Sequence, residues 1–446
     1  MTKWRQLSPI LVINFITTLS FSLVLPFLIV LVLDFGGNAL IYGLLGASFS
    51  LFQLIASPIL GSWSDKKGRR PILLLSHVGT MISWVGLLIA VSISVTELTS
   101  INNNIIGAVM ITVPLVILFL SRIFDGMTGG AVSVANAYLA DISSEEDLAK
   151  NYGYMAVAAN LGFVVGPTMS GLLSNTSFGL KLPIIIALGI GLIGFFMIFF
   201  FLDEDISTPS KVNSEESKPK SKSFRDVLKI PHVSILLLLN FLIFLAFNFF
   251  YVSFPVYALG PDLGWSLTQL GLFYSGFGLT MAITQGPILS YASKRYSEGF
   301  LIILGSIILG AGFAAAAIGN NIAIVACVLL VSVGNGISYP SLLALIASHG
   351  KGNDQGRIQG VASSFGSVAS ILGLISGGLL FESIGKNIFF ISAIIMLLVT
   401  LLSIKFAIME EGHSEYRIHH QANHTFLGSH HLHHIVHKKH ENVQVE

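Results

Sequence analysis

The chain has 446 residues, of which 53% are hydrophobic and only 11% are charged, and its mean hydropathy is +0.79. Soluble domains carry roughly 25% charged residues, so this composition predicts an integral membrane protein that crosses the bilayer many times. The formal net charge of +1 argues against a nucleic-acid partner. The single cysteine, Cys327, excludes a disulfide within the chain.

The first apolar stretch, residues 7–33, is too long for the core of a signal peptide and lacks a small-residue cleavage site. We therefore expect it to be the first membrane span. Further apolar runs follow, and each reaches about the 20 residues that a helix needs to cross a bilayer. They predict an all-α fold of twelve transmembrane helices in the lipid bilayer. The predicted spans are residues 7–33, 41–62, 71–95, 105–139, 149–174, 181–202, 232–259, 267–291, 299–319, 321–347, 358–382 and 387–409.

Lysine and arginine are concentrated in the loops on one side of the predicted membrane. Lys3, Lys150 and Lys294 fall on this side, whereas Lys181 and Lys386 fall on the other. Because cytoplasmic loops are rich in basic residues, this distribution predicts that both termini are cytoplasmic. The expected location is the plasma membrane or an inner membrane.

The first six spans resemble the last six. Pro58-Ile-Leu-Gly61 recurs as Pro287-Ile-Leu-Ser290. Repeats of this kind are typical of transporters, which place their substrate site between the repeats near the middle of the bilayer. They predict two pseudo-symmetric six-helix bundles in one chain, so we expect a monomer. The predicted division is an N-terminal bundle (1–202), a cytoplasmic linker (203–231), a C-terminal bundle (232–409) and a His-rich cytoplasmic tail (410–446).

A charged loop joins spans 2 and 3 and reads Gly61-Ser-Trp-Ser-Asp-Lys-Lys-Gly-Arg-Arg70. Its carboxylate can face a helix N-terminus, and its arginines can bond helix-end carbonyls or the carboxylate of Asp141. Such contacts can break and reform as the bundles move, which would make the loop a latch. The alternative is a plain positive-inside anchor. The candidate latch residues are Gly61, Asp65, Gly68, Arg69, Arg70 and Asp141.

Span 5 carries small residues four apart, Gly162, Gly166 and Ser170, followed by Gly171. This spacing lets a second helix approach closely, and Pro167 permits a bend. One interpretation is a flexing seam between helices. The other, given equal weight, is ordinary small-residue packing.

Span 4 contains an ionisable pair, Arg122 and Asp125, three residues apart on one helix face. Charges within the membrane are costly, so such a pair is a functional hypothesis by default. Asp125 is our candidate proton carrier, with Arg122 controlling its release. The alternative is a static structural pair.

Three of these segments resemble signatures of one family. Residues 61–70 match the loop 2–3 signature of the major facilitator superfamily, residues 122–126 resemble its span 4 signature, and residues 162–171 resemble the span 5 signature of antiporters. Over residues 8–405 the chain resembles the drug/proton antiporter branch, which contains the tetracycline efflux pumps. The resemblance implies alternating access between two bundles, a conformational latch at loop 61–70, and efflux of a small organic molecule coupled to protons.

The chain departs from the tetracycline pumps in span 1. Those pumps carry a membrane-embedded acid before the proline of that span, whereas residues 17–26 here contain none. Proton coupling therefore rests on Asp125 or is absent. Two transport hypotheses stay open: a proton-coupled exporter of a small amphipathic molecule, and an uncoupled facilitator or symporter of an organic metabolite. A non-transporting receptor or scaffold is a third.

Polar side chains within the spans are candidates to line a substrate cavity, because amides bind substrate without needing a counter-charge. Few embedded charges predict a neutral, amphipathic or zwitterionic substrate. No nucleophile–base constellation or phosphate-binding loop is present, so we expect neither an enzyme nor a cofactor. The candidate cavity residues are Asn14, Thr17, Gln53, Asn136, Asn160, Asn240, Asn248, Tyr251, Gln285 and Asn335.

The tail after residue 409 is rich in histidine, a common metal ligand. It lacks cysteine and a fixed helical spacing, so metal binding there is only a speculative alternative to a polar tail without fixed structure. The candidate ligands are His430, His431, His433 and His434.

Overall fold

The computed structural model describes residues 4–103, 106–129, 131–202, 227, 230, 232–349 and 354–409. Nearly all of the predicted linker lies outside these residues, as does the predicted tail with its four candidate metal ligands. Within the described part of the chain, no three His, Cys, Asp or Glu side chains gather in a way that could hold a metal ion.

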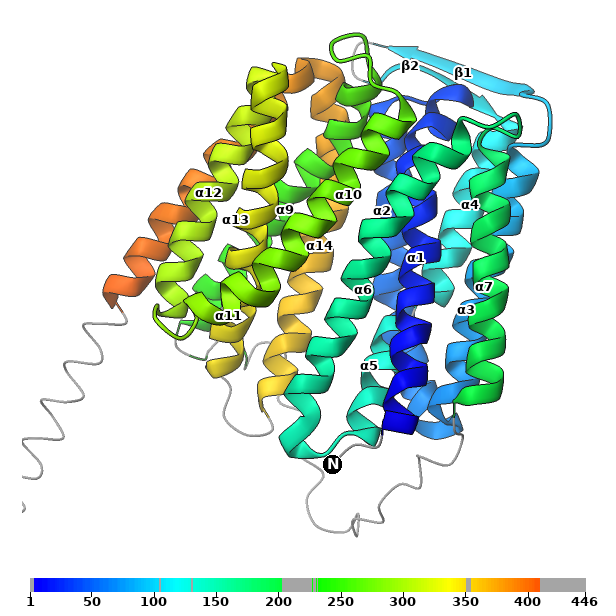
Figure 1. Cartoon of the computed structure of the whole chain (residues 1–446). Helices are drawn as coiled ribbons and strands as arrows, with labels where there is room; N and C mark the ends of the chain where they lie inside the picture. Colours follow the sequence, from blue (N-terminus) through cyan, green and yellow to red (C-terminus); the bar gives the residue numbers. More distant parts are fainter. Residues whose placement is uncertain are drawn as a thin grey trace, which may run out of the picture.

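Residues 4–201, called the N-terminal half below, form seven helices and a hairpin (Figure 1). Asn38 caps α2 by accepting a hydrogen bond from the backbone of Ile41, and Thr112 caps α4 in the same way. Gly68, with φ of +97°, is the single residue between α2 and α3. The helices are α1 (Trp4–Asp34), α2 (Ala39–Lys67), α3 (Arg69–Ala90), α4 (Val113–Thr128), α5 (Ala131–Ile142), α6 (Glu145–Ser174) and α7 (Lys181–Phe201).

An antiparallel β-hairpin, β1 (Glu97–Asn103) and β2 (Gly107–Thr112), corrects two of the predicted spans. Span 3 ends at Ala90 and not near residue 95, and span 4 begins at Val113 and not at 105. Both strands carry β-branched side chains, among them Thr99, Ile101, Val109 and Ile111, which favour extended backbone, and Gly107, whose φ is +78°, follows the turn between them. It is held to the α1–α2 connection by a hydrogen bond of 2.8 Å from Met110 N to Gly36 O.

Residues 233–409, the C-terminal half, are also helical. α10 passes into a π-helical turn that contains Pro287, where the regular hydrogen-bond ladder is interrupted. The elements are α9 (Val233–Leu259), α10 (Leu267–Ile283), the π-turn η1 (Thr284–Ile288), α11 (Leu289–Ala292), α12 (Glu298–Ile318), α13 (Asn321–Ser348), α14 (Asp354–Ile384), the 3₁₀ turn η2 (Gly385–Asn387) and a helical segment over 388–409.

Ten described helical segments are long and apolar enough to cross a membrane. One of them, Ile358–Met409, is interrupted by η2, where the chain turns back on itself (Figure 1). α10 alone has only 17 residues, but together with η1 and α11 it is long enough for a further pass. The arrangement therefore fits the predicted multi-pass all-α fold.

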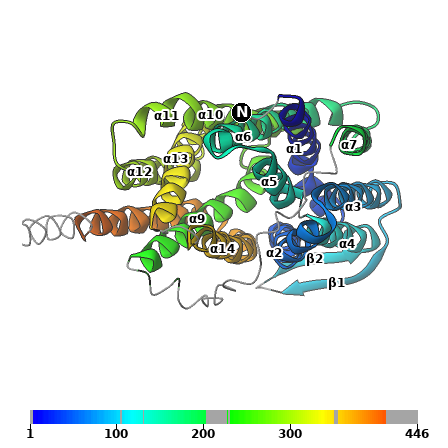
Figure 2. The same ribbon diagram turned by 90° about the horizontal axis from the view of Figure 1, so that it is seen from below.

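The two halves stand side by side, with α6 against α10 and α2 against α14 (Figure 2). The β-hairpin lies at one end of the bundle and the N-terminus at the other (Figure 1). These ends are called the hairpin side and the N-terminal side below.

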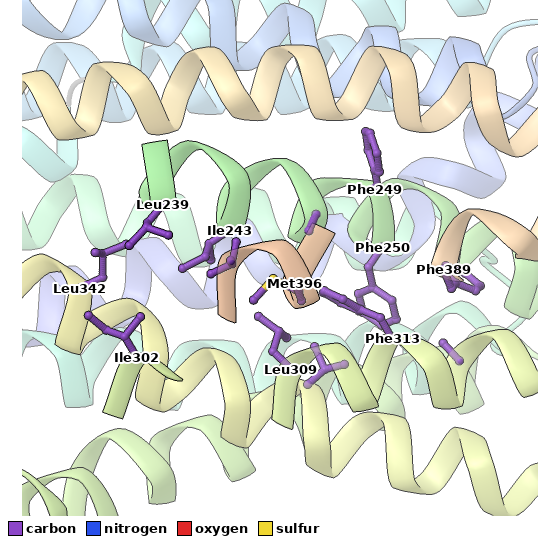
Figure 3. Close-up of a cluster of buried hydrophobic side chains, with 14 of the residues drawn as sticks. Leu239, Ile243, Phe249, Phe250, Ile302, Leu309, Phe313, Leu342, Phe389 and Met396 are labelled. Atoms are coloured by element: carbon purple, nitrogen blue, oxygen red, sulfur yellow. The ribbon is translucent and has the colours of Figure 1, made fainter. Parts of the chain in front are cut away.

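Each half has its own apolar core. In the C-terminal half, Phe250 of α9 packs against Phe313 of α12 and Phe389 of the last helix, with ring centroids 5.4 and 5.8 Å apart (Figure 3). Val252 and Leu374 belong instead to a cluster made mostly of N-terminal residues. The halves therefore share packed apolar surface in addition to their separate cores.

Candidate functional site

A cavity of about 330 Å³ lies where the two halves meet. Helices α1 and α6 wall it from one half, and α9, α10 and α13 wall it from the other. Aromatic rings make up most of the wall, and none of its described lining residues is charged. These residues are Phe21, Leu25, Pro26, Asn160, Phe163, Pro167, Phe247, Phe250, Tyr251, Phe273, Tyr274, Phe277, Gly278, Met281 and Asn335.

Helical spacing brings the aromatic rings to the cavity. Phe247, Phe250 and Tyr251 are three and four residues apart, so they share one face of α9. Phe247 lies 6.2 Å from Phe277 of α10, ring centroid to centroid. On the opposite wall, Phe21 of α1 meets Phe163 of α6 edge to face at 6.5 Å. Both halves therefore present aromatic surface to the same space.

Arg122 and Asp125 form a buried ion pair in α4. The Arg122 Nη1 to Asp125 Oδ2 distance is 2.7 Å, and their side chains are only 5% and 4% exposed. Thr80 of α3 donates a hydrogen bond of 2.9 Å to the other carboxylate oxygen. The carboxylate therefore lies between α3 and α4, inside the N-terminal half.

The guanidinium of Arg122 extends toward the central cavity. It stacks over Phe49 at 4.3 Å from the ring centroid and lies 5.9 Å from the ring of Phe21, a cavity residue. Its Nε has no hydrogen-bond partner among the described residues. Arg122 thus connects the carboxylate of Asp125 to the cavity wall.

Loop 61–70 is compact, and Arg69 is its centre. Arg69 Nε donates to Asp141 Oδ2 at 2.9 Å, and its Nη1 donates to Asp65 and, at 2.7 Å, to Ser64 Oγ. Arg70 donates to the carbonyl of Phe199 at the end of α7. These contacts tie together the ends of α2, α3, α5 and α7, and all of them lie within the N-terminal half.

Helices α6 and α10 join the two halves toward the hairpin side. Thr168 Oγ1 and Ser275 Oγ lie 2.7 Å apart, and Thr268 Oγ1 donates to Gly171 O at 2.9 Å. A Cβ placed on Gly171 would lie 2.7 Å from Thr268 Cα. Gly171 therefore permits contact between the halves.

Gly162 and Gly166 pack elsewhere, against α1 within their own half. A Cβ on Gly162 would lie 2.8 Å from Leu19 N, and one on Gly166 would lie 1.9 Å from Ser22 Oγ. The Ser22 hydroxyl donates to Gly162 O at 2.8 Å.

Helices α2 and α14 form the second junction on the hairpin side. The carboxylate of Glu382 accepts a hydrogen bond of 2.7 Å from the backbone N of Ala39, at the start of α2. A Cβ on Gly43 would lie 2.1 Å from Leu374 O, and one on Gly378 would lie 2.4 Å from Ala39 O. Only glycine allows these backbones to approach so closely.

On the N-terminal side the same two helices diverge. A second cavity of about 550 Å³ separates them there. A Cβ on Gly360 would meet nothing within 4 Å. The halves thus touch on the hairpin side and are separated on the other. The second cavity is lined by Gln53, Leu54, Ser57, Pro58, Gly129, Ser133, Gly360, Ser363, Ser364 and Ser367.

Comparison with known proteins agrees with this architecture. The family model described as Major Facilitator Superfamily matches residues 10–260 and 236–433. The chain belongs to the major facilitator superfamily. It is therefore a multi-pass membrane transporter and not an enzyme.

Two relatives and one solved structure are similar to the chain over most of its length. Tetracycline resistance protein, class D, from Salmonella ordonez is 28% identical over 368 residues, which cover 81% of this chain and 86% of that protein. Multidrug resistance protein 1 from Bacillus subtilis (strain 168) is 27% identical over 375 residues, with coverages of 82% and 87%. The crystal structure of a D-xylose-proton symporter superposes with a TM-score of 0.71 at 14% identity, covering 91% of this chain and 98% of the other. The resemblance to tetracycline efflux pumps is thus confirmed.

The structure distributes the ten predicted cavity residues among several places. Asn160, Tyr251 and Asn335 line the central cavity, and Gln53 lines the second. Asn136 and Gln285 line neither of these two cavities.

Four other predicted cavity residues bond to helix backbones instead. The amide of Asn14 donates to Met155 O at 2.8 Å, and that of Asn240 donates to Ala362 O at 2.9 Å. The Asn248 amide donates to Phe244 O at 2.8 Å, and the Thr17 hydroxyl donates to Ile13 O at 2.8 Å. Each acceptor lies four residues earlier in the same helix. A polar group surrounded by apolar helices takes a backbone partner where it can.

Sequence reasoning missed most of the aromatic wall. Phe163, Phe247, Phe250, Phe273 and Phe277 all line the cavity. The spacing of aromatic residues at three and four positions along α9 and α10 does not mark these residues as cavity-facing. Phe196, Phe199 and Phe200 of α7 have the same spacing and are exposed.

Proposed function

We propose that this transporter exports a small amphipathic organic molecule by alternating access, as a monomer in the plasma or inner membrane with both termini in the cytoplasm. The observation that carries the proposal is the uncharged aromatic cavity at the boundary of the two halves. Aromatic faces bind an apolar body, and the few amide and phenol groups orient its polar edge.

The asymmetry of the two sides supports substrate access from the cytoplasm. The halves contact each other on the hairpin side and are separated by the second cavity on the N-terminal side. The lysine and arginine distribution predicts that the N-terminal side faces the cytoplasm. In this state, substrate enters from the cytoplasm, as efflux requires. The names of the two relatives, which refer to tetracycline and multidrug resistance, support the same direction.

Arg69, Asp65 and Asp141 act as a latch on the cytoplasmic side. Arg69 holds two carboxylates from different helices, so its contacts must rearrange if the ends of α2 and α5 move relative to each other. Gly61 and Gly68 leave the loop room to change. The seam of Gly162, Gly166, Pro167 and Gly171 couples α6 to α1 on one side and to α10 on the other.

Proton coupling acts through Asp125. Its carboxylate contacts Arg122, and Arg122 reaches the wall of the substrate cavity through Phe21. A proton on Asp125 would release Arg122 from its partner, and substrate in the cavity would in turn alter the position of Arg122.

An uncoupled facilitator, or a symporter of an organic metabolite, is the second candidate. Two observations favour it: span 1 has no acid, and the Asp125 carboxylate points to Thr80 and not into the cavity. In this case Arg122 and Asp125 form a structural pair.

Reconstituted vesicles containing a pH-sensitive dye separate the two candidates. Tetracycline and other amphipathic aromatic compounds are added under an imposed proton gradient to wild type and to Asp125→Asn. Proton flux triggered by substrate and lost in the variant supports coupled efflux. Substrate movement without proton flux, equal in both proteins, supports the facilitator. The export proposal fails if no compound moves.

A further inference from the structure

Two side-chain amides in the central cavity have no hydrogen-bond partner. Asn160 of α6 and Asn335 of α13 line the cavity, and neither side chain bonds to any residue that the structure describes. Asn335 is only 9% exposed. Asn160 is half-buried, and both amides open to the cavity, so a ligand bound there can pair with them in place of water.

Other amides within the helices behave differently. Asn14, Gln53, Asn240 and Asn248 each donate to a backbone carbonyl at 2.8 to 3.0 Å. These hydrogen bonds join one helix to another or, for Asn248, one turn of a helix to the preceding turn of the same helix. Asn160 and Asn335 differ from these four amides in two ways: they have no described hydrogen-bond partner, and they line the central cavity.

The two free amides come from opposite halves of the transporter. They line one cavity of about 330 Å³, which is at the lower end of the size that holds one drug-sized molecule. Aromatic rings flank this space on both sides, with Phe21 and Phe163 from one half and Phe247 and Phe277 from the other. A flat ligand can therefore stack on rings while its edges reach the amides.

We propose that Asn160 and Asn335 form a clamp that binds the two polar edges of one uncharged, planar polycyclic molecule. The proposal rests on the proposed transport function and adds the residues that determine specificity. Neutral hydroxyl or carbonyl groups suit the amides, which both donate and accept. A single ligand that bonds to both halves also links occupancy of the cavity to the relative position of the halves.

The test uses an anthracene that carries a hydroxymethyl group at each end, and a matched hydrocarbon that carries methyl groups in their place. Binding to the purified full-length protein in lipid nanodiscs is measured by fluorescence anisotropy, with empty nanodiscs subtracted. The variants are Asn160→Leu and Asn335→Leu. Ser332→Ala is the control, because the Ser332 hydroxyl lies on the same helix as Asn335 but donates to the carbonyl of Val328 at 2.6 Å.

We expect one diol molecule to bind per chain. Each asparagine variant should lower affinity for the diol about tenfold, which corresponds to one lost hydrogen bond with its partner left unpaired. Affinity for the hydrocarbon should stay within about twofold, because the aromatic wall is unchanged. The Ser332→Ala variant should bind both probes as wild type does.

Other results overturn the clamp. Unchanged diol affinity in both asparagine variants would show that the amides do not recognise the ligand, while transport of either probe would leave the export function standing. A parallel loss of both probes would show that the amides only shape the cavity. If wild type neither binds nor transports either probe, the clamp and the proposed function fail together.

Discussion

The carboxylate of Glu382, at the end of α14, accepts a hydrogen bond of 2.7 Å from the backbone of Ala39, at the start of α2. The two residues are 343 positions apart and belong to opposite halves. A carboxylate at a helix N-terminus is stabilised by the free backbone N–H groups and the helix dipole. This contact therefore holds α14 and α2, and with them the two halves, together on the hairpin side.

Removing the charge of Glu382 should increase the fraction of molecules that are open on the hairpin side. Such an interaction contributes about 1 kcal/mol, so Glu382→Gln should raise the open population about fivefold. Val252, which is buried among residues of the other half, can report opening when replaced by cysteine. A membrane-impermeant maleimide should label Val252→Cys about fivefold faster in the Glu382→Gln background. Glu298→Gln, at the far end of the molecule, is the control and should leave the labelling rate of Val252→Cys unchanged. If Glu382→Gln and Glu298→Gln give equal labelling rates, Glu382 does not hold the halves together.

The Arg122–Asp125 pair should show strong coupling in stability. Breaking a buried ion pair leaves an uncompensated charge and costs about 3–5 kcal/mol, whereas replacing both members by apolar residues can be nearly neutral. Asp125→Leu should therefore lower thermal stability markedly, and Arg122→Met combined with Asp125→Leu should recover most of the loss. Unfolding monitored by tryptophan fluorescence in detergent gives both values. If the double variant loses the sum of the two single losses, the side chains are not energetically paired.

The seam in α6 offers a matched pair of glycine substitutions. Gly162→Ala places a methyl group against the backbone of Leu19 and should destabilise the protein by about 1–3 kcal/mol. Gly153→Ala, in the same helix, meets nothing within 4 Å and should be neutral or stabilising by up to about 1 kcal/mol. Thermal unfolding of both variants decides the matter. Equal behaviour would mean that α1 and α6 do not pack as closely as described.

Arg69 should matter for transport more than for stability. Its side chain is 16% exposed and Asp65 is 63% exposed, so their ion pair contributes only about 0–1 kcal/mol to folding. Arg69→Gln should nevertheless slow transport in vesicles, because the latch no longer reforms in each cycle. Lys66→Gln, an exposed neighbour that makes no described ion pair, should transport normally. A latch role is contradicted if the two variants transport at the same rate.

The sequence predicted the charged features better than the cavity. Loop 61–70 and the pair Arg122–Asp125 could be located because a charge within or between membrane spans is costly and rarely accidental. The cavity face could not be located in the same way, because lipid-facing and inward-facing sides of a membrane helix are both apolar. Phe250, which faces the cavity, and Phe200, which is 68% exposed, therefore look alike in sequence.

The hairpin was missed for a related reason. Residues 105–112 are apolar and adjoin a real membrane helix, so a hydrophobicity window joins them to it. The strand pattern, with exposed and buried residues alternating after Gly107, becomes evident only when β1 pairs with β2.

The most direct test of alternating access measures both ends of the molecule at once. Spin labels at Ser177→Cys and Asp262→Cys report the hairpin side, and labels at Lys66→Cys and Ser293→Cys report the N-terminal side. All four positions are exposed, and the native Cys327 is buried. Pulsed electron paramagnetic resonance in nanodiscs should give two populations whose balance changes when a transported compound is added, with one pair of labels separating as the other approaches. Single, unchanged distances for both pairs under every condition would contradict alternating access in this protein.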